Sequence, residues 1–154
     1  MRSACRRRRS SGELFIVRDI GNFVPDPEGA RGAGMSAAIE YAVGVLGVQK
    51  IVVCGHSGCG AIQALLAGTP TGVLPHLDAW MTTMQSSSLR DLPRRLHPDE
   101  IARLNALRQL DHLARYPVVA ARVREGKLTL AAWFFDVATG ELEQWSPEAQ
   151  RFVA

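Results

Sequence analysis

The residues with the most recognisable chemical potential lie between positions 54 and 60, in the stretch Cys-Gly-His-Ser-Gly-Cys-Gly. His56 and Cys59 are three residues apart in this stretch. An imidazole nitrogen and a thiolate sulfur are ligands that zinc prefers. A His-x-x-Cys pair also occurs in proteins that hold no metal, so the spacing by itself leaves a structural interpretation open. We take His56 and Cys59 as candidate zinc ligands.

Other reactive side chains have plainer explanations. Cys54 belongs to an apolar run, and we expect a buried, inert thiol there. Its distance from Cys59 is not the Cys-x-x-Cys spacing of thiol oxidoreductases, and Ser57 lacks the Gly-x-Ser-x-Gly context of a hydrolase nucleophile. No glycine-rich turn ends in the Gly-Lys-Ser/Thr of a phosphate-binding loop. We expect structural or solvated roles for the other three histidines, His76, His97 and His112.

The candidate ligands need a strand and a helix to hold them. Residues 51–53 are β-branched and predict a buried strand that ends at Gly55. A glycine-rich turn then leads into a predicted helix over residues 60–67. Ligands of α/β folds sit beyond the carboxyl ends of strands, and this is where His56 and Cys59 fall.

The first half of the chain predicts one more strand and one more helix. The apolar run 13–18 predicts a buried strand, and residues 19–29 predict a loop from their Gly, Pro and Asn content. Residues 36–46 show the spacing of an amphipathic helix. This strand, this helix and the strand at 51–53 would form a right-handed βαβ crossover, which implies a parallel sheet.

The second half predicts helices followed by a hairpin. Helices are expected over 74–84, 98–116 and 118–124, with a break and a loop between 86 and 98. The long helix has a predicted apolar face made of Ile101, Leu104, Leu107, Leu110 and Leu113. Residues 128–137 predict a strand, and a turn at 138–140 leads to a return over 141–145.

These elements together predict an α/β fold. We expect a three-layer-like domain with a mostly parallel central sheet, a βαβ crossover and an antiparallel edge strand near the C-terminus. At 154 residues the chain is long enough for one domain with a hydrophobic core, and no internal repeat divides it.

Composition and charge limit the classes of partner that we expect for this protein. The net charge of +3 is outweighed by four consecutive arginines at 6–9, so we expect a disordered basic tail over 1–11 and a single domain over 12–154. The sequence has neither a basic stripe with interleaved aromatic residues nor an apolar run of membrane-spanning length, so we expect no nucleic-acid and no membrane partner. Three cysteines without an export signal indicate a cytoplasmic protein.

Two segments of the chain resemble the β-class carbonic anhydrases. Residues 12–22, Gly-Glu-Leu-Phe-Ile-Val-Arg-Asp-Ile-Gly-Asn, are similar to the family's Arg-Asn-x-Ala/Gly-Asn loop, with Asp19 in place of the usual Asn. Residues 55–60 match its Gly-His-Ser/Thr-x-Cys-Gly zinc motif. The resemblance spans about residues 12–146 and implies that His56 and Cys59 descend from zinc ligands. It also implies a zinc lyase that hydrates carbon dioxide to bicarbonate, and a homodimer or higher oligomer.

One family motif has no counterpart in the sequence. The family binds zinc through two cysteines and one histidine, and its first cysteine belongs to a Cys-x-Asp-x-Arg motif on an earlier strand. Here Cys5 is followed by arginines and has no Asp two positions on, so the Asp–Arg dyad and its catalytic role cannot be assigned to any residue.

The missing motif keeps two interpretations open. We expect that the family's N-terminal helices and first strand are missing or replaced in this chain, and Cys5 as a third zinc ligand is a hypothesis. The alternative to an active carbonic anhydrase is an inactive relative that binds zinc weakly or serves only as a folded partner subunit. The sequence does not separate carbon dioxide from related substrates such as carbon disulfide or carbonyl sulfide.

Overall fold

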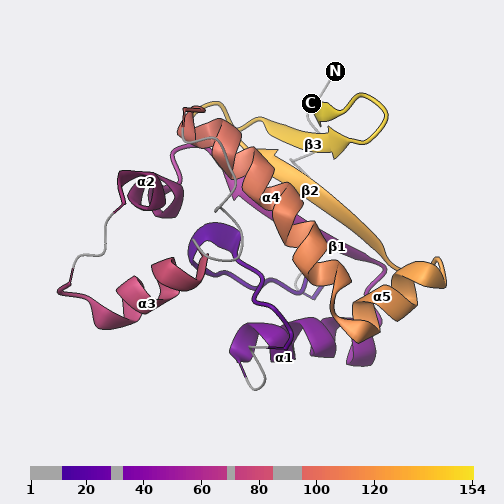
Figure 1. Cartoon of the computed structure of the whole chain (residues 1–154). Coiled ribbons are helices and arrows are strands. Elements are labelled where there is room, and N and C mark those ends of the chain that lie inside the picture. Colours follow the sequence, from indigo (N-terminus) through magenta and orange to yellow (C-terminus); the bar gives the residue numbers. More distant parts are fainter. Residues whose placement is uncertain (1–11, 29–32, 69–71, 85–94) are drawn as a thin grey trace.

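A mixed four-stranded sheet forms the centre of the molecule (Figure 1). The computed structural model describes residues 12–28, 33–68, 72–84 and 95–154. β1 and β2 pair in parallel, whereas the pairs β2–β3 and β3–β4 are antiparallel. The α/β class is confirmed, with a mixed sheet rather than the mostly parallel one expected. The strands are β1 (Lys50–His56), β2 (Thr129–Phe135), β3 (Leu142–Ser146) and β4 (Arg151–Val153), in that spatial order.

The helices lie close to their predicted positions. Gly68 adopts a left-handed conformation that ends α2, and Pro98 and Pro117 stand in the first turns of α4 and α5, where a missing N–H costs nothing. No helix in the described ranges is long and apolar enough to cross a membrane. The helices are α1 (Gly34–Glu40), continued by the π-helical turn η3 (Tyr41–Val45), α2 (Gly60–Ala67), α3 (Pro75–Met84), α4 (Pro98–Ala114) and α5 (Pro117–Arg124).

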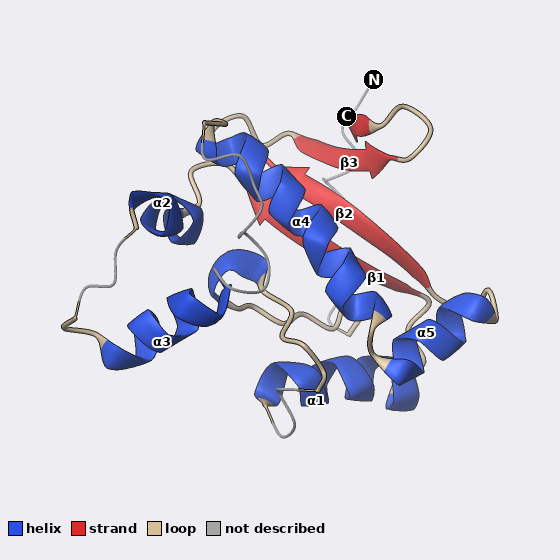
Figure 2. Ribbon diagram, in the orientation of Figure 1, coloured by secondary structure: helices blue, strands red, loops and turns tan. Residues whose placement is uncertain are grey.

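Helix α4 lies diagonally across one face of the sheet (Figures 1 and 2). Val53, Ala132 and Phe134 point toward it and are all buried. The approach is close at Gly55, where a Cβ atom would stand 3.0 Å from the backbone oxygen of Ala102. Glycine at this position therefore lets α4 lie directly against the end of β1.

The opposite face of β1 corrects a prediction. Cys54, expected to be a buried thiol, is exposed. Neighbouring strand residues point to opposite faces, so Val53 and Gly55 face α4 and Cys54 faces away from it. The sequence predicts a buried strand over 51–53 and a buried thiol at Cys54, but within the described residues α4 covers only one face of β1.

The predicted strand over 13–18 is wrong. The described residues there form no strand, and Leu14 and Ile16 are 56% and 65% exposed. The run lies instead beside the first helical segment, where the rings of Phe15 and Tyr41 are 6.1 Å apart. A short apolar run predicts burial but does not say against what, so a surface segment can carry the same pattern.

The βαβ crossover is therefore different from the expected one. The parallel pair consists of β1 and β2, and the chain between them passes through α2, α3, α4 and α5. The antiparallel return near the C-terminus is confirmed, but β3 is not the edge. The short strand β4, which the sequence did not predict, pairs outside it.

The buried face of α4 is more polar than expected. Of the five predicted apolar positions, Ile101 and Leu113 are buried, whereas the other three are only partly buried. Asn105, Gln109 and His112 are buried in their place. The expected tail over 1–11, and most of the expected break and loop between 86 and 98, lie outside the described residues.

Candidate metal centre

His56 and Cys59 lie on either side of the turn from β1 to α2. His56 is the last residue of β1, and Cys59 is the N-cap of α2. His56 is exposed, whereas Cys59 is 6% exposed and forms no disulfide. The structure thus brings both predicted ligands to the carboxyl end of a parallel strand, as the sequence predicts.

The ring of His56 is oriented for metal binding. Its Nδ1 atom lies 2.9 Å from the backbone oxygen of Ser57. A carbonyl oxygen can only accept, so Nδ1 carries the proton and the lone pair of a neutral ring is on Nε2. Histidine ligands of metals typically donate their other N–H to a carbonyl or carboxylate in this way. Nε2 is therefore the atom available to a metal.

Cys59 sits in an apolar environment at a helix start. Its side chain belongs to a buried cluster with Ile62, Ile101, Ala102 and Phe134. The first N–H groups of α2 are the positive end of the helix dipole, which suits an anionic sulfur such as a metal-bound thiolate. A sulfur donor and a nitrogen donor side by side fit a borderline-soft metal such as zinc.

The residues between the two ligands are held by hydrogen bonds to distant segments. The backbone N–H of Ser57 donates to the oxygen of Phe135 at 3.0 Å, and the Ser57 hydroxyl accepts from the N–H of Val137 at 2.9 Å. The N–H of Gly58 donates to Oδ1 of Asp99 at 2.8 Å. The turn is thus fixed to the end of β2 and to the start of α4.

A second loop lies against the same elements. Its 3₁₀ turn η2 (Ile20–Asn22) is reached by α3, whose Trp80 donates from Nε1 to the oxygen of Ile20 at 3.1 Å. Gly21 has a φ of +74°, and a Cβ atom there would collide with Met84 of α3 and contact Ala61 of α2. Only glycine fits this position, because it needs both a left-handed backbone and no side chain.

Polar side chains on α4 hold the backbone of this loop. Asn105 donates from Nδ2 to the oxygen of Gly21 at 3.0 Å. Gln109 accepts from the N–H of Val24 at 2.8 Å and donates to Oδ1 of Asn105 at 2.8 Å. His112 lies with Nδ1 2.7 Å from the oxygen of Val24, so this nitrogen carries a proton. These side chains pair backbone groups that water cannot reach.

The polar row continues to Tyr116, which lies just beyond α4 and is the N-cap of α5. Its hydroxyl donates to the oxygen of Pro25 at 2.9 Å and also lies 2.9 Å from the hydroxyl of Ser36. Burial raises the pKa of Tyr116 above its usual value. Hydrogen bonding to the N–H of Glu28, together with the Arg115 guanidinium, lowers the pKa of Asp26.

Apolar periodicity does not reveal this row. Asn105, Gln109 and His112 recur at spacings of four and three residues, which places them on one face of α4, and Tyr116 follows as the N-cap of α5. The spacing was visible in the sequence, but the partners are backbone groups of a loop more than 80 positions away.

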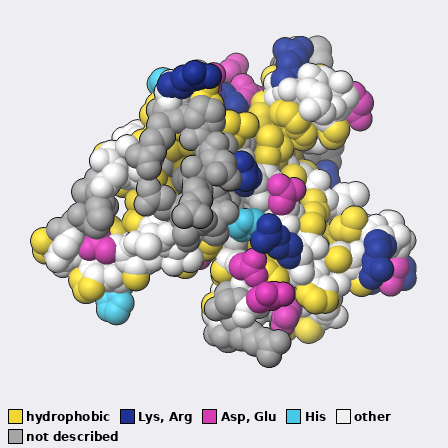
Figure 3. Space-filling view, in the orientation of Figure 1, with side chains coloured by type: hydrophobic (Ala, Val, Ile, Leu, Met, Phe, Trp, Pro, Cys, Tyr) yellow, Lys and Arg dark blue, Asp and Glu magenta, His cyan; other side chains and the backbone are white. Residues whose placement is uncertain are grey.

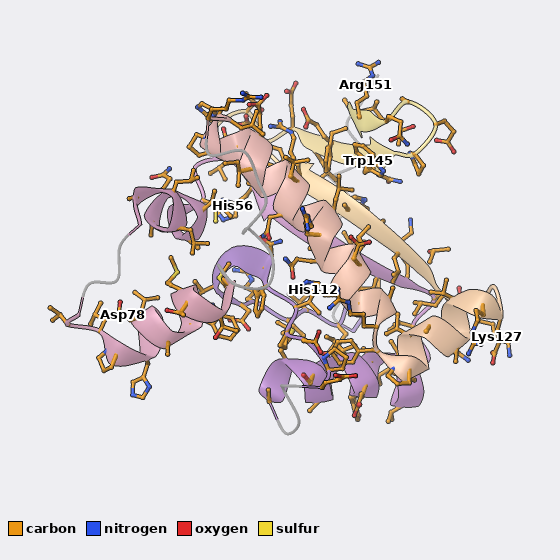
Figure 4. The ribbon with its side chains drawn as sticks, viewed as in Figure 1. His56, Asp78, His112, Lys127, Trp145 and Arg151 are labelled. Atoms are coloured by element: carbon orange, nitrogen blue, oxygen red, sulfur yellow. The ribbon has the colours of Figure 1, made fainter. Side chains whose placement is uncertain are left out.

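His97 and His112 take part in structure, whereas His76 is exposed on α3. His112 has the loop contact described above, and His97 caps α4, its Nδ1 accepting from the N–H of Asp99 at 3.3 Å. Figure 4 shows His56 near α2 and His112 farther along α4, in separate regions of the molecule. The structural role expected for His112 is confirmed.

A third ligand is not provided by the described ranges. Within residues 12–28, 33–68, 72–84 and 95–154, no group of three or more His, Cys, Asp or Glu side chains is placed to hold a metal ion. Cys5, the hypothetical third ligand, lies outside these ranges. His56 and Cys59 therefore fit zinc as part of a ligand set, and not as all of it.

Comparison with known proteins identifies close relatives. The profile of the family described as Carbonic anhydrase matches residues 5–142, which extends the resemblance back to Cys5. The chain is 38% identical to a carbonic anhydrase of Pseudomonas aeruginosa, over 95% of this chain and 68% of that protein. It is 36% identical to a carbonic anhydrase of Synechococcus elongatus, over 88% of this chain and 52% of that protein. It thus spans about half the length of the cyanobacterial relative.

Solved structures show the same fold. The β-carbonic anhydrase CcaA aligns with a TM-score of 0.83 and 34% identity, covering 94% of this chain and 73% of that one. One of two β-carbonic anhydrases from Sordaria macrospora, described as tetrameric, aligns with a TM-score of 0.73 and 28% identity, covering 94% of this chain and 72% of that one.

Proposed function

Because the chain belongs to the β class of the carbonic anhydrase family, we propose that it binds zinc through His56 and Cys59 and reversibly hydrates carbon dioxide to bicarbonate. The observation that carries the proposal is the orientation of His56. Its Nδ1 proton is engaged by the Ser57 carbonyl, which leaves Nε2 for the metal at the turn where Cys59 supplies sulfur.

Each residue at the proposed zinc site has a separate role. Zinc, when bound, supplies an activated water at neutral pH. His56 and Cys59 hold the metal, and the carbonyl of Ser57 fixes the histidine tautomer. The apolar cluster around Cys59 keeps water from one side of the sulfur. Similarity to the carbonic anhydrase relatives supports classification of the chain as a carbonate dehydratase, and the hydration assay described below tests its activity.

We propose Cys5 as the third ligand. The described residues offer no third group, and the family match begins at residue 5. Two protein ligands leave two tetrahedral positions open, whereas a catalytic zinc site has three protein ligands and one open position. A cysteine is the residue type that the family uses at the third position.

Zinc content and carbon dioxide hydration test the proposal together. We expect purified chain to retain about one zinc per polypeptide after dialysis, and to lose it in His56→Ala and Cys59→Ser. Cys5→Ser should also lose zinc if Cys5 is the third ligand. Cys54→Ser is the matched control, because it makes the same substitution at a cysteine of β1 that is not a proposed ligand, and it should retain zinc. Stopped-flow hydration should follow the zinc content.

The same measurement decides between the active enzyme and the inactive relative. Zinc retained by the wild-type chain together with measurable hydration would support the enzyme. A chain that folds but retains no zinc and hydrates no carbon dioxide would contradict the proposal. Zinc retained in Cys5→Ser would contradict the role of Cys5 while leaving His56 and Cys59 in place.

We further propose that the chain assembles with itself in the cytoplasm. Apolar side chains that are 43–68% exposed gather on two neighbouring segments, comprising Leu14, Phe15, Ile16, Val17, Tyr41, Val45 and Leu46. A contiguous exposed apolar surface of this kind is typical of an interface. The view in Figure 3 shows Lys and Arg side chains scattered among acidic ones rather than gathered in a stripe. Sedimentation velocity should show a dimer or larger species that Ile16→Lys weakens.

A further inference from the structure

We propose that Asp99 is a positioning residue for the zinc site, whose carboxylate holds the backbone between the two ligands. Gly58 lies between His56 and Cys59, and its N–H donates to Oδ1 of Asp99 at 2.8 Å, across 41 positions of sequence. A carboxylate acceptor makes this bond charge-assisted and short. The inference rests on the proposed zinc site, because it assigns a role in holding that metal.

The backbone at Gly58 needs such a restraint. Its φ is +64°, and among the described residues no atom beyond its chain neighbours lies within 4 Å of the position that a Cβ would take. Packing therefore does not hold this residue in place, and hydrogen bonds have to do so. The bond from the Gly58 N–H to Asp99 restrains the backbone directly before Cys59.

The restraint on the other side of the turn comes from the sheet. Ser57 is bonded to Phe135 and to Val137, at the end of β2. These bonds fix the His56 end of the turn. Asp99 fixes the Cys59 end, so the distance between the two ligands depends on the position of α4 relative to β2.

Asp99 is itself held firmly. It is the second residue of α4, and its own N–H donates to Nδ1 of His97 at 3.3 Å. The positive end of the helix dipole favours a carboxylate at this position. One turn further along, Ala102 lies so near Gly55 that a side chain there would meet its carbonyl oxygen, so the start of α4 packs closely on β1.

The next residue of α4 provides a matched control. Glu100 Oε2 accepts from the N–H of His97 at 3.0 Å and completes the capping box of α4, and this bond does not involve the ligand turn. Glu100→Ala should therefore destabilise the start of α4 without removing the acceptor of Gly58. Asp99→Asn keeps an oxygen acceptor and removes the charge.

Zinc affinity, measured by competition with a chromogenic chelator, tests the proposal. We expect Asp99→Ala to weaken zinc binding about 10- to 100-fold, which is typical when a group that supports a metal ligand is removed. Glu100→Ala should bind zinc nearly as tightly as the wild type, and Asp99→Asn, which keeps the acceptor but not the charge, should weaken binding less than Asp99→Ala. Equal weakening in Glu100→Ala would show an effect of helix stability and overturn the proposal, as would unchanged affinity in Asp99→Ala.

A second readout does not depend on zinc. In metal-free protein, NMR should show slow hydrogen exchange at the Gly58 amide in the wild type and Asp99→Asn, and fast exchange in Asp99→Ala. Fast exchange already in the wild type would overturn the proposal. If the wild type binds no zinc, the proposed function fails, and Gly58 exchange still decides whether Asp99 holds the turn.

Discussion

Two loops near the end of β1 are held in opposite ways. The ligand turn, residues 57–59, is largely exposed around Gly58, and three long-range hydrogen bonds fix it. The buried loop, residues 21–26, is mostly inaccessible, and its backbone is paired by side chains of α4. A buried backbone group without a partner costs free energy, whereas an exposed one can turn to water.

This difference predicts where mutations will act. Changes in the buried loop or its supports should lower the free energy of unfolding, because they leave polar groups unpaired or create clashes. Changes in the ligand turn should affect zinc more than folding. The two effects are separable by measuring denaturation of the metal-free protein beside zinc affinity.

A pair of glycines gives the largest expected contrast. Gly21→Ala should destabilise by about 2–5 kcal/mol, because left-handed backbone disfavours a side chain and the new methyl collides with Met84. Gly58→Ala has the same backbone cost but no collision, so we expect about 1–2 kcal/mol. Urea denaturation measures both, and equal losses would contradict the proposed difference between the loops.

Gln109→Leu should produce the next largest loss. The substitution removes the acceptor of the Val24 N–H and the donor to Asn105, and leaving these two buried groups unpaired should cost about 2–4 kcal/mol in total. The control is Asp111→Ala, an exposed position on the same helix, which should change stability by less than about 0.5 kcal/mol. Thermal or chemical unfolding of the two variants decides whether the polar row stabilises the fold.

Removal of one hydroxyl should have a smaller effect. Tyr116→Phe loses the bond to Pro25 and the contact with Ser36, which we expect to cost about 1–2 kcal/mol. Tyr41→Phe makes the same change on a side chain that is 49% exposed and should be nearly neutral. If both variants unfold alike, the Tyr116 hydroxyl does not support the buried loop.

The smallest effect concerns pH. The pKa of Asp26 is lowered in the folded chain, by the Glu28 N–H first and by Arg115 second, so the unfolded state binds its proton at higher pH. Its contribution is therefore complete above the ordinary aspartate pKa and is lost as pH falls through the lower folded value. We expect wild type to lose slightly more stability than Asp26→Asn between about pH 4 and pH 2. Parallel loss in both proteins would contradict this.

The sequence predicted those elements that local patterns determine. The helix over 60–67 and the strand at 51–53 follow from periodicity and from the glycines between them, and they bring His56 and Cys59 to the carboxyl end of a strand. The prediction of a strand over 13–18 was wrong, because apolar character does not specify a partner strand. The prediction that Cys54 is buried was wrong, because successive residues of β1 alternate between the face covered by α4 and the exposed face.

Local sequence patterns did not predict the side chains that hold the backbone around the site. Asp99 reaches Gly58 across 41 positions, and Gln109 reaches Val24 across 85, so neither contact has a sequence signature by itself. Both depend on how α4 crosses the sheet. The sequence therefore singled out His56 and Cys59 as candidate ligands, but not the side chains that hold the surrounding backbone.

Zinc X-ray absorption tests the central claim most directly, because it identifies the donor atoms around the metal. We predict nitrogen at about 2.0–2.1 Å and two sulfur donors at about 2.3 Å around the zinc of the wild-type chain. Cys5→Ser and Cys59→Ser, which we expect to lose zinc on dialysis, are measured with one equivalent of zinc added back, and each should show one sulfur donor fewer than the wild type. A zinc shell made only of oxygen and nitrogen in the wild type would contradict the account.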